Sequence, residues 1–73
     1  MKIYFNAPMP GKIFEICISE GENIEKGQPL IILDSMKMLN KLLAEKDGTI
    51  ISIKTKTGDF VSTQEVLLEI DEK

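Results

Sequence analysis

Few side chains in this 73-residue sequence could take part in chemistry, and the most unusual is a lysine between two methionines, Met36-Lys37-Met38. The chain has no histidine and one cysteine, Cys17, so it lacks a base–nucleophile pair, an internal disulfide and the ligands of a zinc site. Cys17 lies in the apolar run Ile13 to Ile18, which predicts a buried strand residue rather than a reactive thiol. Lys37 is then either an ordinary solvated lysine or an amine held out for another enzyme.

Charge and apolar run length argue against a nucleic-acid partner and against membrane insertion. The formal net charge is −3, and the nine basic residues are scattered along the chain, which argues against a nucleic-acid partner. The longest apolar runs, such as Pro29 to Leu33, are too short to cross a bilayer, so we expect no membrane insertion. No basic segment followed by an apolar one opens the chain, so we expect a cytoplasmic protein rather than a secreted one.

The segment around Lys37 has a local pattern that favours a helix. Asp34 or Ser35 could cap such a helix, Gly48 could end it, and apolar residues recur at helical spacing between them. On local propensity alone, the sequence DSMKMLNKLLAEKDG therefore predicts a helix.

An internal repeat contradicts this helix. Residues 6–34 align with residues 43–71 without a gap, and seven of the 29 aligned pairs are identical. The identical pairs are Ala7/Ala44, Gly11/Gly48, Ile13/Ile50, Ile16/Ile53, Gly21/Gly58, Leu30/Leu67 and Asp34/Asp71. The part of the supposed helix that starts at residue 43 aligns with a segment containing Pro8 and Pro10, which a helix interior excludes. Because related copies share a fold, the segment after Lys37 is predicted to be extended.

Each copy predicts four strands separated by turns. The strands are expected at about 2–6, 12–18, 23–25 and 29–34, and again at about 38–44, 49–55, 60–62 and 66–71. Four turns are expected to use the positive φ that glycine tolerates, at Gly11, Gly21, Gly48 and Gly58. The core is expected to contain Ile13, Ile16, Ile24, Leu30, Ile32, Ile50, Ile53, Val61 and Leu67.

The predicted fold is all-β and forms one domain over residues 1–73. Eight short strands indicate a flattened β-barrel or sandwich of two four-stranded antiparallel sheets, related by a pseudo-twofold axis. Lys37 falls between the two copies, so this axis places its turn and the chain termini at opposite ends of the domain.

The turn itself breaks a local rule. A two-residue hairpin connection normally contains glycine or asparagine, because its central residues need positive φ. The central pair here is Met36-Lys37, for which positive φ costs on the order of 1 kcal/mol per residue. Sequences break such rules where function requires it. Residue spacing alone does not decide between two interpretations of this turn: a functional Lys37, or an ordinary surface turn whose strain is tolerated.

The stretches APMPGKI and EGENIEKGQPLIILDSMKM resemble the biotinyl domain of biotin-dependent carboxylases and decarboxylases, over essentially the whole chain. The resemblance implies that biotin is attached covalently to Lys37 and that a biotin protein ligase reads Met36 and Met38. Asp34 and Ser35 stand where the family usually has Glu-Ala.

The same resemblance implies a fold and a role. The fold would be a barrel-sandwich hybrid, and no insertion separates Gly11 from Gly21, so the thumb of some acetyl-CoA carboxylase carriers is missing. The chain would be a carrier without catalytic residues. Biotin on Lys37 would accept carboxylate from a biotin carboxylase and deliver it to a carboxyltransferase or decarboxylase site.

Two alternatives share this fold. Lipoyl domains of 2-oxoacid dehydrogenase complexes also modify a hairpin lysine, but they usually place aspartate before it and alanine after it, so Met36 and Met38 favour biotin. A non-carrier domain, such as the hairpin domain of efflux adaptor proteins, gives no reason for methionines around an exposed lysine. The group found on Lys37 distinguishes the three possibilities.

Overall fold

The structure is a computed structural model that describes residues 1–73, and it contains eight strands and no helix. The strands are β1 (Lys2–Asn6), β2 (Gly11–Ile16), β3 (Asn23–Ile24), β4 (Pro29–Ser35), β5 (Met38–Leu43), β6 (Gly48–Ile53), β7 (Phe60–Val61) and β8 (Val66–Glu72). All eight predicted strands are confirmed, with ends that differ by two residues at most. The local helix pattern after residue 34 is therefore overridden, and no helix long and apolar enough to span a membrane exists.

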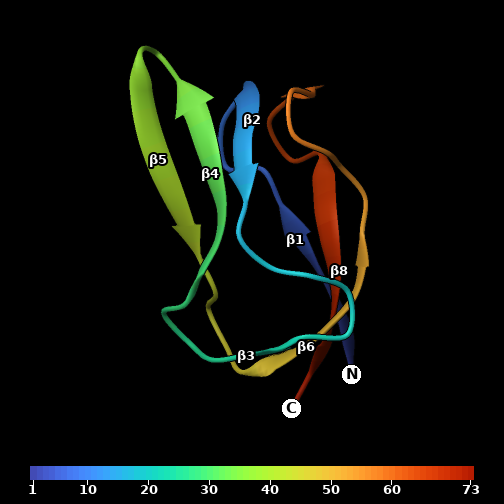
Figure 1. Ribbon diagram of the computed structural model, residues 1–73. Coiled ribbons are helices and arrows are strands. Elements are labelled where there is room, and N and C mark those ends of the chain that lie inside the picture. Colours follow the sequence, from blue (N-terminus) through green and yellow to red (C-terminus); the bar gives the residue numbers. More distant parts are fainter.

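The strands form two four-stranded sheets, which we call sheet A and sheet B. Sheet A has the strand order β1-β8-β6-β3, and sheet B has the order β5-β4-β2-β7 (Figure 1). Every pairing is antiparallel, and β2 and β3 are joined without a protruding thumb. The fold is a sandwich of two open sheets rather than a closed barrel.

The internal repeat is visible in the register of the strands. Each sheet takes two strands from each copy, so the copies exchange strands across the sandwich. In sheet B, Ile13 of β2 pairs with Leu33 of β4; in sheet A, Ile50 pairs with Ile70, which is the same pair 37 positions later. The bulge that follows Ile13 recurs after Ile50. The repeat predicted from the sequence is thus confirmed residue by residue.

The core lies between the two sheets and consists of 14 buried apolar side chains. They are Ala7, Ile13, Ile18, Ile24, Leu30, Ile31, Leu33, Leu42, Ala44, Ile50, Val61, Leu67, Leu68 and Ile70. The predicted core residues Ile16 and Ile53 are partly buried against this cluster. The prediction for Ile32 is wrong: strand alternation turns Ile31 and Leu33 inward and leaves Ile32 half-exposed on the outer face of sheet B.

Cys17 lies outside the core, contrary to the prediction. β2 ends at Ile16, and the bulge between Ile13 and Glu15 shifts the alternation, so Ile18 is buried and Cys17 is exposed. Partial desolvation, with a smaller effect of the Glu15 carboxylate, raises the pKa of the Cys17 thiol. A raised pKa keeps the thiol protonated, so Cys17 is a weak nucleophile despite its exposure.

Two of the four predicted turn glycines have a different role. Gly21 and Gly58 adopt φ of +87° and +94°, as predicted. Gly11 and Gly48 instead open strands β2 and β6 and have no positive φ. A Cβ on either would lie 2.6 Å from a backbone carbonyl oxygen of the neighbouring strand. Glycine is required there because two backbones approach closely, rather than because a turn needs it.

The two roles of these glycines predict that replacing them with alanine destabilises the fold by different amounts. Gly11→Ala and Gly48→Ala should each lower the free energy of unfolding by about 3 kcal/mol, because the new Cβ meets backbone that cannot rotate away. Gly21→Ala has open space around its Cβ, so it should cost only about 1 kcal/mol, from the positive φ. Urea titration of the three variants measures the difference, and equal losses would contradict the close-approach interpretation.

Candidate functional site

The β4–β5 hairpin places Lys37 at one end of the molecule, and both termini lie at the other end (Figure 1). The molecule has a largest dimension of 34 Å. The opposite placement predicted from the pseudo-twofold repeat is therefore confirmed. A segment joined to either terminus would leave the end of the molecule that carries Lys37 clear.

The turn has the strained geometry that the sequence predicts. Ser35 and Met38 form the last pair of the β4–β5 ladder, so Met36 and Lys37 are the two connecting residues. Their φ angles are +53° and +65°. Positive φ at both positions is what a type I′ hairpin turn requires, and neither residue is the glycine or asparagine that adopts it easily. The backbone here is held by the surrounding structure.

Side-chain hydrogen bonds hold the base of the hairpin. The Ser35 hydroxyl is buried and donates to the carbonyl oxygen of Pro10 at 2.7 Å. On the opposite strand, the Asn40 amide donates to the carbonyl oxygens of Met38 at 3.2 Å and Leu33 at 3.4 Å. β4 is also an inner strand of sheet B, paired on both sides. These contacts fix the base, so the strained turn cannot relax by sliding the two strands.

The tip of the hairpin is fully presented to solvent. The Met36 side chain is 91% exposed and the Met38 side chain 65% exposed, and Lys37 is exposed between them. Lys37 takes part in none of the four salt bridges. Asp34, the other residue singled out beside the turn, is half-buried near the end of β4, where it pairs with Leu39. The arrangement offers an unpaired amine flanked by two soft apolar side chains.

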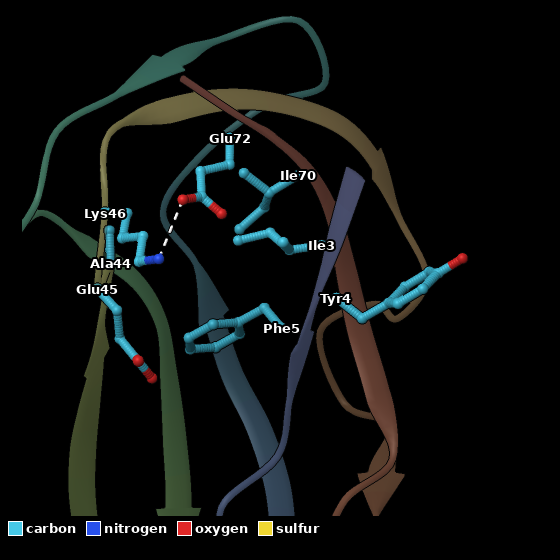
Figure 2. A pocket seen from close by; sticks show the side chains of 8 residues that line it. All are labelled: Ile3, Tyr4, Phe5, Ala44, Glu45, Lys46, Ile70 and Glu72. Carbon is cyan, nitrogen blue, oxygen red and sulfur yellow. Dashed lines mark hydrogen bonds and ion pairs between the residues drawn. The ribbon is translucent and has the colours of Figure 1, made fainter. Parts of the chain in front are cut away.

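The structure has no metal-binding cluster, and a cavity lined by β1 and β8 lies away from Lys37. No cluster of three or more histidine, cysteine, aspartate or glutamate residues could hold a metal ion. A cavity of about 210 Å³ lies between β1, the end of β8 and residues 44–46, where Lys46 forms a 3.0 Å ion pair with Glu72 (Figure 2). That cavity is at the end with the termini and contributes nothing to Lys37. The hairpin presents the Lys37 amine to solvent.

One residue with positive φ was not predicted. Gln64 is the third non-glycine residue with positive φ, at +70°. Its counterpart 37 positions earlier is Gly27, with φ of +88°, so the repeat itself contained the signal. The Asn6 amide donates to the Gln64 side-chain oxygen at 3.4 Å, and the Gln64 backbone N–H donates to the Ala7 carbonyl at 2.7 Å.

Comparison with known proteins gives consistent matches. Residues 3–70 match the family described as "Biotin-requiring enzyme". The chain is 42% identical over 62 residues to the biotin/lipoyl attachment protein of Bacillus subtilis (strain 168), covering 85% of each chain. It is 38% identical over 64 residues to the biotin carboxyl carrier protein of Streptococcus mutans, covering 88% of this chain and 49% of that protein.

The fold has close counterparts among solved structures. It superposes on part of a single-chain, multi-domain long-chain acyl-CoA carboxylase with a TM-score of 0.94 and 25% sequence identity. The match covers 99% of this chain and 7% of that one. The chain thus spans most of the small Bacillus protein, about half of the Streptococcus carrier and a small part of the carboxylase.

The strain in the turn can be tested by removing it. Replacing Met36-Lys37 by Asn-Gly should raise the free energy of unfolding by about 1–2 kcal/mol, because these residues adopt positive φ at low cost. Lys37→Ala keeps the strain and should change the stability by no more than about 0.5 kcal/mol. Both are measured by urea titration. An unchanged or lower stability of the Asn-Gly variant would show that the turn is not strained.

Proposed function

The chain belongs to the biotin/lipoyl family of biotin-requiring enzymes, and from this premise we propose that it is a biotin carboxyl carrier with biotin attached to Lys37. The observation that carries the proposal is the β4–β5 turn. It is the point where the fold keeps two non-glycine residues at positive φ and exposes one amine between two methionines. A surface turn without a function has no need of this combination.

Attachment requires an enzyme that activates the carboxyl group of biotin. In the proposed reaction a biotin protein ligase forms the biotinyl adenylate, and Lys37 Nζ attacks its carbonyl carbon. An amide bond forms, AMP leaves, and the amine gives up the proton that would otherwise prevent attack. Because the amide is neutral, one positive charge is lost, and the formal net charge of the chain changes from −3 to −4.

The role of the chain after attachment is mechanical. Biotin held at Lys37 would supply the chemistry that carries carboxylate between a biotin carboxylase and a carboxyltransferase or decarboxylase site. The chain contributes a rigid hairpin that holds the attachment point away from its own surface. Its termini lie at the other end, so a link there leaves the tip free to visit two sites at high local concentration.

The exposed methionines favour biotin over lipoate as the attached group. Met36 and Met38 have no packing role that would explain them, since both are largely exposed. A ligase that reads apolar side chains on both sides of the lysine gives them a function. The Bacillus relative is named for attachment of either group and the Streptococcus relative for biotin, so a lipoyl carrier is the alternative that an experiment should exclude.

The proposal predicts one modification at one residue. Incubation with biotin protein ligase, biotin and ATP should add a single biotinyl group, which peptide mapping should locate on Lys37. Lys37→Arg should abolish the labelling and leave the fold intact, because the side chain makes no internal contact. Lys41→Arg, which changes another exposed lysine of the same hairpin, is the matched control and should label normally.

Two results would contradict the proposal. Label on any other lysine would exclude Lys37 as the attachment site. Labelling by a lipoate ligase, with none by the biotin ligase, would identify the chain as a lipoyl carrier.

A further inference from the structure

The repeat allows the two ends of the molecule to be compared at the positions that follow β4 and β8. Met36 and Pro10 at the hairpin end correspond to Lys73 and Asp47 at the end with the termini. There, the Lys73 N–H donates to the Asp47 carbonyl oxygen at 3.2 Å. At the hairpin end this backbone bond is missing, and the Pro10 carbonyl oxygen accepts instead from the Ser35 hydroxyl at 2.7 Å. A side chain thus makes at one end the contact that the backbone makes at the other.

The reversal of the chain accompanies this exchange of donors. Past β8 the chain continues to Lys73 without a turn, whereas past β4 it reverses at Met36, whose φ is +53°. The turn gives up the backbone bond, and the residue before it supplies the donor. The repeat partner of Ser35 is Glu72, whose carboxylate forms an ion pair elsewhere. The hydroxyl is therefore a feature of the hairpin end alone.

Ser35 is also the one polar residue among the 16 buried residues of the chain. It is 8% exposed, and its hydroxyl bonds to the Pro10 carbonyl oxygen. Gly11 leaves room for it, because a Cβ at Gly11 would lie 3.2 Å from Ser35 Cβ. Burying a hydroxyl costs free energy unless it is hydrogen-bonded, so the packing around Ser35 is built on this one bond.

The acceptor belongs to a firmly held part of the chain. The Ala7 N–H donates to the Glu65 carbonyl oxygen at 2.9 Å, and the Ala7 carbonyl oxygen accepts from the Gln64 N–H at 2.7 Å. The Met9 side chain packs against the core, and the ring of Pro10 restricts φ. The hydroxyl bond therefore ties the last residue before the turn to a fixed point outside the hairpin.

We propose that Ser35 is a positioning residue for the Lys37 amine, an inference that rests on the proposed function. The ligase must receive the turn in one conformation, and two non-glycine residues at positive φ favour its opening. The bond from Ser35 to Pro10 opposes that opening from the position directly before the turn. Because Ser35 is buried, it acts through the backbone of Met36 rather than by contact with the ligase.

The test removes the hydroxyl alone. In Ser35→Ala the carbonyl of Pro10, an exposed residue, can bind water, so the variant should fold. Losing one hydrogen bond shifts an opening equilibrium about fivefold, and hydrogen exchange of the Met38 amide should accelerate by that factor. The ligase KM for the chain should rise about threefold with kcat unchanged, because opening lowers the fraction of chain that can bind. Circular dichroism verifies the fold.

A matched control removes a hydroxyl hydrogen bond away from the hairpin. Ser52 is half-buried in β6 of sheet A, and its hydroxyl donates to Glu69 Oε1 at 3.2 Å. β6 pairs with β3 and β8 and with neither strand of the hairpin. Ser52→Ala should therefore lower the midpoint of thermal unfolding as Ser35→Ala does, but leave the exchange at Met38 and the ligase KM within about 1.5-fold of the original.

The outcomes distinguish this inference from the proposed function. A parent chain that the ligase does not label would refute the function itself. A labelled parent chain with the same KM and Met38 exchange in Ser35→Ala, or an equal rise in Ser52→Ala, would refute only the positioning role. A lower kcat of Ser35→Ala at unchanged KM would assign the hydroxyl to the chemical step and also overturn the proposal.

Discussion

The β4–β5 turn depends on the rest of the structure to keep Met36 and Lys37 at positive φ. Left to itself, a hairpin with these residues would open the turn, because each costs on the order of 1 kcal/mol in that conformation and a lone hairpin is barely stable in water. The compensation comes from the sandwich. Ile31 and Leu33 anchor β4 in the core, and the Ser35 hydroxyl ties the last ladder position to Pro10. The rest of the chain is thus a scaffold that makes one unfavourable turn permanent.

The duplicated architecture explains how so small a chain supplies that scaffold. Because the copies exchange strands, each sheet contains strands from both, and neither copy could form its sheet alone. The pseudo-symmetry also gives the molecule two ends with the same backbone arrangement but different roles. One end holds the termini, and the other holds the turn that joins the copies. Differences between matched residues therefore mark positions where the two halves have been given separate roles.

Much of the fold could be predicted from the sequence, because the repeat supplied long-range information that local patterns lack. The proline pair at residues 8 and 10 excluded a helix near residue 44, and the position of Lys37 between copies located it opposite the termini. The site could be predicted as far as its turn and its exposure. The attachment of biotin to Lys37, and the reading of Met36 and Met38 by a ligase, stay predictions.

The wrong predictions, for Cys17 and Gly11, share a physical cause. Both residues are placed by the pairing between strands. The bulge in β2 changes which side chains face inward, and no residue type marks it in advance; Cys17 was placed on the wrong side for that reason. Gly11 resembles a turn glycine after Pro10, but it is needed because the β4 backbone passes within contact distance. Such constraints follow from tertiary pairing and cannot be derived from one strand at a time.

The central claim is that the fold, rather than the residues near Lys37, makes this lysine an acceptor. The most direct test compares the ligase labelling rate of the full chain with that of a peptide covering residues 30–44, which contains the same hairpin sequence. Without the sandwich, two residues at positive φ, at about 1 kcal/mol each, should reduce the reactive conformation about thirtyfold, so we expect the peptide to label at least that much more slowly. Equal rates for peptide and chain would contradict the account.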